Sequence, residues 1–413
     1  MLKKIDVAQL RTGMYIQELC GSWLDTPFWQ KSLLLEDPTI LEKIRKSKIR
    51  QAWIDTSKGL DVLSQQDESK PEKPAVPEPA APPPAALAPS YDQVPQISMD
   101  EELGRAAKIV GKSKQALLSM FSEARMGKAV NSEAAMELVE EIASSVMRNP
   151  GALIGLARLK NADDYTYMHS VAVAALMIAL ARQLKLDDEK TREAGFAGLL
   201  HDIGKMAVPS GILNKPGKLT DDEFVSVKEH PAAGYKMLLE AKGVGEIALD
   251  VCLHHHEKMD GTGYPDRLAG AQISLYARMG AICDVYDAIT SNRPYKQGWC
   301  PAESVKKMAE WSKGHFDESV FQAFVKSIGI YPVGTLVRLA SGKLGVVVEQ
   351  AAKSLLMPKV RVFFSTKSLA YVTPELLDLA GPGLQDKIVA REDAAKWGLK
   401  DINRYWLGDA APG

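Results

Sequence analysis

The stretch Ala197–Lys205 reads AGLLHDIGK, and it places a histidine and an aspartate side by side at the end of a predicted apolar helix. Gly204 favours a helix stop just after this pair. All seven histidines lie between residues 169 and 315, in less than half of the chain. Imidazoles and carboxylates concentrated in this way are typical of a metal site. We therefore expect a metal centre with His201 and Asp202 at its middle.

Length and composition narrow the class of protein. A chain of 413 residues is too long for one ordinary core and predicts two or three domains. The net charge of −1 gives no indication of a nucleic-acid polymer as partner. The four cysteines show no CxxC spacing, which favours a reduced cytoplasm. The longest apolar run, residues 171–181, is too short to cross a bilayer, so we expect a cytoplasmic protein without a membrane span.

The predicted fold is multidomain and mainly α. Five segments differ in pattern: a small α/β domain over 1–62, a proline- and alanine-rich linker over 63–97, connecting helices over 98–149, a helical bundle over 150–330 and a small β-rich appendage over 331–413. Nine of the 23 prolines fall between residues 71 and 95. Such a composition buries too little apolar surface to fold, so the linker is expected to be an extended tether.

Three features outside the bundle have more than one interpretation. The basic run over 43–50 is either a phosphate-binding face or, more simply, a solvated helix face. The prolines at 82–84 are either a docking ligand or part of a spacer. The amphipathic helices between 99 and 148 either pair across a homodimer or relay a signal, or they lie against the bundle, which is slightly favoured.

Local patterns predict the elements around these segments. In the N-terminal domain they predict a strand and loop over 7–16, a helix over 38–48 and a strand over 51–54. A capping box of Thr220 and Glu223 starts a helix that is predicted to end at His230. In the appendage, alternating apolar residues predict strands at 335–339, 345–350 and 360–364.

Seven residues near helix ends or on apolar helix faces are candidate metal ligands: His169, His201, Asp202, His230, His255, His256 and Asp284. A helical bundle can direct such side chains inward to form a polynuclear site. Asp202 is the natural bridge, because the two oxygens of one carboxylate can bind two cations. A set of imidazoles and carboxylates without a thiolate suits iron, manganese, nickel or zinc.

Several motifs of the chain resemble those of a known family. HDIGK at 201–205, HHE at 255–257 and GYP at 263–265 resemble the HD-GYP subclass of the HD phosphohydrolase superfamily. Further stretches resemble it in order and spacing, namely YTYMHS at 165–170, ILNKPGKLT at 212–220 and DVYDAITSNRPYK at 284–296. The first 62 residues also resemble a small domain that often precedes HD-GYP domains.

The resemblance implies hydrolysis of cyclic di-GMP, a bacterial second messenger, to pGpG and on to GMP. It implies one metal held by His169, His201, Asp202 and Asp284, and a second held by His230, His255, His256 and the shared Asp202. Iron or manganese is the metal expected at both positions, with nickel or zinc as alternatives. Lys205, Arg293 and Lys296 match positions that meet substrate phosphates. Tyr264 belongs to the substrate-facing loop, which in the family also contacts diguanylate cyclases.

Several residues keep a second interpretation. Lys205 is either catalytic or a cation that stabilises a helix C-terminus. Asp287 is either a partner of a ligand or an ordinary helix residue. His254 is expected to be structural, and His315 is given no chemistry. Some family members hold a third metal through a glutamate at the position that is Tyr165 in this chain. A tyrosine cannot serve in the same way, so two metals are expected here.

Three functions remain open from the sequence alone. The first is a metal-dependent cyclic-di-GMP phosphodiesterase. The second is a phosphohydrolase of the same superfamily that acts on another cyclic dinucleotide. The third is a catalytically silent module that binds cyclic di-GMP or a cyclase. The intact ligand set and Lys205 favour an enzyme, because a pure binder has no need for a site that activates water.

Overall fold

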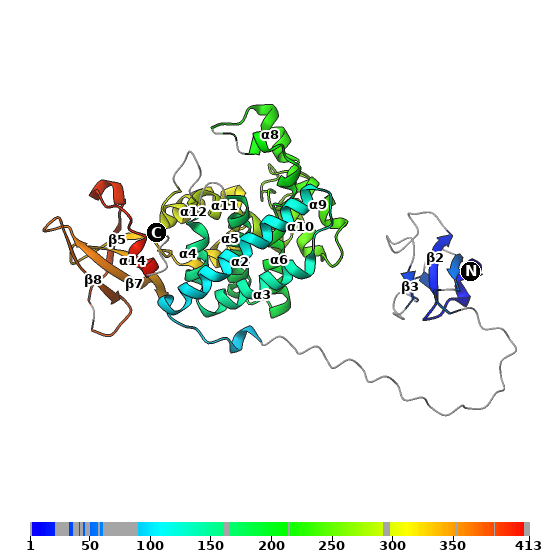
Figure 1. Cartoon of the computed structure of the whole chain (residues 1–413), viewed down its shortest axis with the longest axis horizontal. Helices are drawn as coiled ribbons and strands as arrows, with labels where there is room; N and C mark the ends of the chain where they lie inside the picture. The colour runs from blue at the N-terminus through cyan, green and yellow to red at the C-terminus, as the bar shows by residue number, and fades with distance from the viewer. Residues whose placement is uncertain are drawn as a thin grey trace, which may run out of the picture. The chain divides into compact units, whose positions relative to one another are not determined.

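The chain forms two compact units, Met1–Ala85 and Ala86–Gly413. The computed structural model describes residues 2–20, 33–35, 41, 44–45, 50–56, 58–60, 90–159, 165–213, 215, 217–291, 298–351, 354–383 and 385–408. None of the helices among these residues combines the length and the apolar character needed to span a bilayer. The fold is mainly helical with a small sheet in each terminal part, as the sequence predicts (Figure 1).

The N-terminal unit contains a four-stranded antiparallel sheet in the order β1-β4-β2-β3. Its elements are β1 (Leu2–Asp6), η1 (Val7–Gln9), β2 (Tyr15–Cys20), β3 (Leu33–Leu34) and β4 (Gln51–Asp55). The strand predicted over 51–54 is confirmed, because Ala52 and Ile54 alternate inward as the pattern requires. The stretch 7–16 is instead divided between η1 and the start of β2. The predicted helix over 38–48 and the basic run over 43–50 lie mostly outside the described residues.

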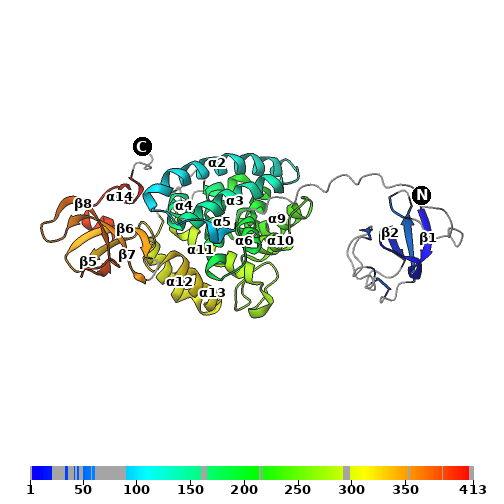
Figure 2. The ribbon, with the colours of Figure 1, turned by 90° about the horizontal axis from the view of Figure 1, so that it is seen from below.

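The helical bundle is built around α5 (Tyr165–Gln183), which lies among the other helices in Figure 2. Every residue of α5 from Met168 to Ala181 is buried. Its neighbours are α4 (Pro150–Arg158), α6 (Asp188–Leu200) and α11 (Leu275–Thr290). The other elements of the bundle are η4 (Ile203–Ala207), α7 (Ser210–Leu213), α8 (Asp221–Lys228), α9 (His230–Leu239), α10 (Glu246–His254), η5 (Gly270–Gln272), α12 (Pro301–His315) and α13 (Glu318–Ile328).

The two connecting helices, α2 (Met99–Arg125) and α3 (Ser132–Arg148), lie against the bundle and share its apolar core. Glu102 of α2 is fully buried and accepts hydrogen bonds from Ser145 Oγ at 2.7 Å and Arg148 Nε at 2.6 Å. Such a buried, paired carboxylate fixes the contact between the two helices. The sequence left open how these helices pack, and the structure shows α2 and α3 packed against the bundle.

The chain contacts this unit before α2 begins. Tyr91 in η2 (Tyr91–Gln93) is buried, its N–H donates to Asp188 Oδ2 at 3.0 Å and its hydroxyl donates to Glu140 Oε2 at 2.9 Å. The last residues of the segment assigned to the linker thus pack on the bundle. Residues 61–89, with the prolines at 82–84, lie outside the described part of the chain.

The C-terminal part forms a five-stranded antiparallel sheet in the order β8-β7-β6-β5-β9. Its elements are β5 (Leu336–Leu339), β6 (Lys343–Ala351), β7 (Ser354–Ser365), β8 (Ala370–Asp378) and β9 (Ile388–Arg391), followed by η6 (Ala394–Trp397) and α14 (Arg404–Leu407). The three predicted strands are present. The strands β8 and β9 were not predicted. β8 is exposed along nearly its whole length and carries no apolar alternation, and β9 has only four residues.

The helix boundary at His230 differs from the prediction. The helix that starts at the Thr220 capping box ends at Lys228, and His230 begins the next helix with Pro231 in its first turn. A proline is well placed there, because the N–H that it lacks would have no partner inside the helix. His230 therefore stands at a helix start and not at a helix end.

Candidate metal centre

Five separate helices or helix ends bring the seven candidate ligands together. His169 is the fifth residue of α5, His201 and Asp202 follow α6, His230 begins α9, His255 and His256 follow α10, and Asp284 lies within α11. Six of the seven are buried, and only His256 is partly open, with 23% of its side chain exposed. The cluster thus lies in the interior of the bundle, with access from the side of His256.

The close approach of η4 to α9 depends on Gly204. A Cβ atom at this position would lie 1.9 Å from the carbonyl oxygen of His230 and 2.4 Å from the backbone nitrogen of Gly234. Any other residue would force the two elements apart. Glycine here lets His230 Nε2 approach Asp202 Oδ1 to 3.2 Å.

Backbone carbonyls determine the tautomers of three histidines. The Nδ1 atoms donate to backbone oxygens, from His201 to Gly198 at 2.8 Å, from His230 to Val227 at 2.7 Å and from His255 to Val251 at 3.0 Å. A carbonyl can only accept a hydrogen bond, so each Nδ1 carries the proton and each Nε2 presents a lone pair. The histidines thereby have the form that binds a metal ion.

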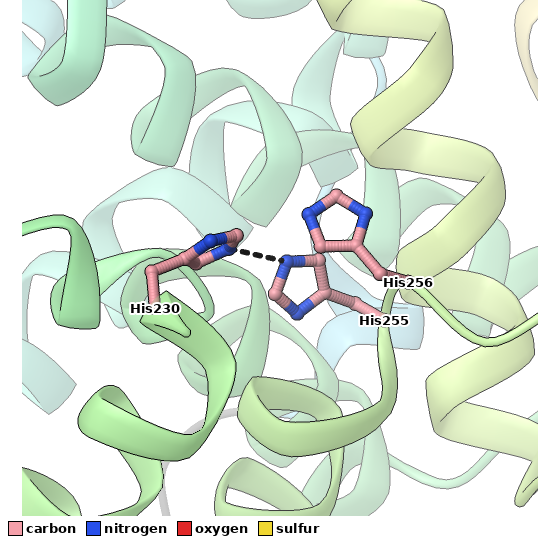
Figure 3. A group of neighbouring side chains, drawn as sticks. All are labelled: His230, His255 and His256. Atoms are coloured by element: carbon pink, nitrogen blue, oxygen red, sulfur yellow. Dashed lines mark hydrogen bonds between the residues drawn. The ribbon is translucent and has the colours of Figure 1, made fainter. Parts of the chain in front are cut away.

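These lone pairs point at one another. The Nε2 atoms of His230 and His255 are 3.4 Å apart, and Figure 3 shows the two rings converging beside His256. Two lone pairs at this separation repel unless a cation lies between or beside them. Among the described residues, His201 Nε2 and Asp202 Oδ1 are also buried without a hydrogen-bond partner. Leaving such atoms unpaired costs about 1–3 kcal/mol each, which a bound cation would offset.

Asp202 faces a different pair of imidazoles with each of its oxygens. Oδ1 lies 3.2 Å from His230 Nε2 and 3.8 Å from His255 Nε2. Oδ2 lies 3.4 Å from the Nε2 atoms of both His169 and His201. This is the arrangement required of a carboxylate that bridges two cations. Two ligand groups are accordingly found, His230 with His255 and His256, and His169 with His201 and Asp202.

Asp284 and Asp287 flank His169 from α11. Asp284 Oδ1 lies 3.0 Å from His169 Nε2, on the side of the cluster, while Asp287 Oδ2 accepts from His169 Nδ1 at 2.6 Å. A carboxylate behind a ligating histidine orients the ring and makes it a stronger ligand. The structure thus gives Asp287 a positioning role, which the sequence left open. Its spacing of three residues from Asp284 puts both on one helix face, which does not by itself distinguish the role of Asp287 from that of Asp284.

The charge states suit a cation. Burial tends to raise the pKa of Asp202, but the ammonium of Lys205 and the imidazole of His201 hold this pKa well below its usual value. Burial lowers the pKa of His255 well below its usual value and that of His256 to about 3. For Asp202, His255 and His256 these are the protonation states that metal binding requires. At His169 burial acts to lower the pKa, but the carboxylates of Asp202, Asp284 and Asp287 raise it to about 10, so a metal ion bound there would displace a proton. By chemistry and geometry, the residues present fit a divalent metal centre.

Lys205 and Tyr264 border the cluster. The Lys205 ammonium donates to Asp202 Oδ2, and 20% of its side chain is exposed. The Tyr264 ring stacks on His256, with centroids 4.7 Å apart and planes at 27°. Both side chains therefore lie where a substrate would reach the metal ligands.

The remaining residues named from the sequence are placed elsewhere or not at all. Arg293, Lys296 and Asp164 lie outside the described residues, as does the side chain of Tyr165. His254 has its Nδ1 2.7 Å from Asp250 and its Nε2 3.1 Å from Asp266, so it joins α10 to the GYP loop, in agreement with a structural role. His315 stacks on Phe316 with centroids 4.2 Å apart.

Glu257 and Lys228 belong to this surrounding but were not singled out from the sequence. Glu257 is 2% exposed, and its Oε1 accepts from the Asp266 N–H at 2.7 Å. The Lys228 ammonium lies 5.4 Å from the centroid of the Tyr264 ring. For Glu257 the signal is its place directly after two candidate ligands. For Lys228 no local pattern distinguishes it from a solvated lysine.

Comparison with known proteins agrees with the fold and the cluster. Residues 137–320 match the HD domain family, and residues 2–135 match a domain of unknown function, DUF3391. The chain is 55% identical over 99% of its length, and 96% of the relative's, to cyclic di-GMP phosphodiesterase PA4108 of Pseudomonas aeruginosa. It is 41% identical over 35% of its length, and 39% of the relative's, to the cyclic di-GMP phosphodiesterase response regulator RpfG of Xanthomonas campestris.

A third relative has a different substrate in its name. The 3′3′-cGAMP-specific phosphodiesterase 1 of Vibrio cholerae is 37% identical over 40% of this chain and 38% of that protein. Of these three relatives, the first is matched over nearly its whole length, and the match extends through the N-terminal domain, the bundle and the C-terminal sheet of this chain. With its HDIGK and GYP motifs and this full-length similarity, the chain belongs to the HD-GYP phosphodiesterases of the HD domain family.

Proposed function

We propose that this protein is a cytoplasmic, metal-dependent phosphodiesterase that hydrolyses cyclic di-GMP to pGpG and on to GMP, and so lowers the level of the second messenger. The carboxylate of Asp202, whose two oxygens face two separate pairs of imidazoles, carries the chemical part of this proposal. The substrate is supported by the full-length similarity to a cyclic di-GMP phosphodiesterase.

The proposed centre holds two ions, with iron or manganese favoured by the nitrogen and oxygen ligands. His169, His201, Asp202 and Asp284 are the proposed ligands of one ion, and His230, His255, His256 and Asp202 those of the other. When bound, two such ions would polarise the scissile phosphate and activate water as the nucleophile.

The chain's own side chains bind and orient the substrate. The Lys205 ammonium is charged and within reach of solvent, so it can meet the phosphate oxygens on which negative charge develops. Tyr264 limits the opening on the side of His256. We propose Arg293 and Lys296 as further phosphate contacts, on the resemblance of their motif alone. Asp287 holds His169 in the orientation that keeps its Nε2 directed at the centre.

The test combines metal analysis with a product assay on the purified protein. We expect about two metal ions per chain after loading with Fe(II) or Mn(II), and conversion of cyclic di-GMP to pGpG. Parallel assays with 3′3′-cGAMP would show which cyclic dinucleotide has the higher kcat/KM. A metal-loaded protein that binds cyclic di-GMP but forms no linear product would identify a silent module. Three tightly held ions would contradict the binuclear centre.

Two partners complete the proposal. The GYP loop is proposed to contact diguanylate cyclases, and the chain is proposed to form a homodimer. The first rests on the family resemblance of residues 263–265. The second rests on the exposed positions of α2 and α3, on the sides that do not pack against the bundle. Sedimentation of the purified chain, alone and with a diguanylate cyclase, would test both, and a single monomeric species in each case would contradict them.

A further inference from the structure

Helix α8 stands beside the opening of the metal centre. It projects from the body of the bundle in Figure 1, and none of its residues is buried. Phe224 and Val225 are exposed by 47% and 59%. The Phe224 ring contacts a cation on the same helix.

Lys228, at the end of α8, lies between two aromatic rings. Its Nζ is 4.7 Å from the centroid of Phe224 and 5.4 Å from that of Tyr264. Tyr264 in turn stacks on the candidate ligand His256. The Lys228 ammonium thus contacts the Tyr264 ring, and this ring contacts His256 at the metal centre. The ammonium lies on the side where His256 is partly exposed to solvent. Cations are attracted to aromatic faces at this distance.

No carboxylate among the described residues pairs with Lys228. Two other lysines do have carboxylate partners: Lys215 pairs with Glu223 at 2.7 Å, and Lys205 contacts Asp202. The distinction matters for an incoming anion. A cation–π contact contributes about 0.5–1 kcal/mol at an exposed site. A hydrogen bond to a charged group contributes about 1.5–3 kcal/mol, so a phosphate can recruit this ammonium without first breaking an ion pair.

The substrate of the proposed reaction carries a second phosphate, which such a cation can bind. A cyclic dinucleotide carries two phosphates, and the second lies across the ribose–phosphate ring from the one that is cleaved. Only one of them can occupy the metal centre beside Lys205. We propose that Lys228, held between Phe224 and Tyr264, binds the non-scissile phosphate of the cyclic dinucleotide. This inference rests on the proposed function and adds a binding subsite to it.

Substitution of Lys228 tests the subsite. Lys228→Met keeps the aliphatic stem that packs on the rings but removes the charge. We expect KM for cyclic di-GMP to rise about tenfold, since about 1.4 kcal/mol of binding is lost, while kcat stays within about twofold. Lys228→Arg should retain most of the affinity. Lys236→Met, on an exposed position of α9, is the matched control and should behave as the unmodified protein.

A substrate with a single phosphate separates this role from a structural one. Bis(p-nitrophenyl) phosphate has no second phosphate, so Lys228→Met should hydrolyse it as fast as the unmodified protein. Parallel losses on both substrates would show that Lys228 only supports Tyr264, and unchanged kinetics on cyclic di-GMP would show that it binds no phosphate; either result overturns the inference. If the unmodified, metal-loaded protein does not hydrolyse cyclic di-GMP, the proposed function is wrong. The assay of the unmodified protein shows this independently of the Lys228 variants.

Discussion

At the scale of single residues, Asp202 and Lys205 are in contact, yet we expect their loss to have different effects. Asp202→Ala removes a carboxylate that faces both groups of imidazoles, so most of the bound metal and all measurable turnover should disappear. Lys205→Met should keep the metal, because a protonated ammonium cannot be a ligand. Its kcat should fall by about 10²–10³, the usual effect of losing one group that stabilises developing negative charge.

Metal content by elemental analysis, measured beside kcat, distinguishes the two variants. Lys205→Met should bind metal at least as tightly as the unmodified protein, since the ammonium competes for Asp202 Oδ2. Thermal unfolding of both variants controls for misfolding. Equal loss of metal from the two variants would show that the division between ligand and phosphate-binding residue is wrong.

At the scale of elements, the GYP loop is attached to α10 through Glu257. This side chain accepts from the Asp266 N–H, and a Cβ at Gly263 would lie 2.5 Å from the Glu257 Cα, so the loop packs directly on it. Glu257→Ala would remove a part-buried hydrogen bond from the Asp266 N–H to a charged carboxylate, and such a bond contributes about 1.5–3 kcal/mol to the free energy of unfolding. It should also raise KM, because Tyr264 loses its support beside His256.

Glu257→Gln is the matched control for the loop. Its amide oxygen can still accept from the Asp266 N–H, so stability and KM should stay close to those of the unmodified protein. Thermal unfolding and steady-state kinetics on the two variants measure both effects. If Gln were as harmful as Ala, the charge of Glu257 and not its hydrogen bond would be what the loop requires.

At the scale of the whole molecule, the structure defines where a catalytic fragment should begin. A fragment over 90–413 keeps Tyr91 with its contacts to Asp188 and Glu140, whereas one over 98–413 loses them. Removing a buried aromatic side chain costs about 3–5 kcal/mol. We therefore expect the shorter fragment to unfold at a clearly lower temperature, while both retain the metal, because all candidate ligands lie beyond residue 98.

Calorimetry and metal analysis of the two fragments test this division. Equal melting temperatures would show that η2 contributes nothing to the stability of the bundle. Loss of metal from the fragment over 90–413 would show that the N-terminal domain helps to form the centre. A changed rate with unchanged metal content would instead indicate that this domain regulates the enzyme.

The sequence alone determined which chemistry this protein carries. The apolar run of α5, the HD pair at the end of α6 and the concentration of histidines are local features, so the helical fold and the type of ligand could be predicted from them. Several motifs in the order and spacing of the HD-GYP family then indicated the class of reaction. These signals are readable because helix ends and apolar periodicity depend on neighbouring residues.

Only the tertiary structure decided how the groups meet. His169 and Asp287 are 118 positions apart, and their contact separates the role of Asp287 from that of Asp284, which no local pattern could do. The two oxygens of Asp202 acquire different neighbours because Gly204 lets η4 approach α9. The same holds for β8, which pairs with β7 through its backbone, and for Lys228, whose two rings come from different elements. Contacts of this kind depend on packing between distant segments, and a linear sequence does not display that packing.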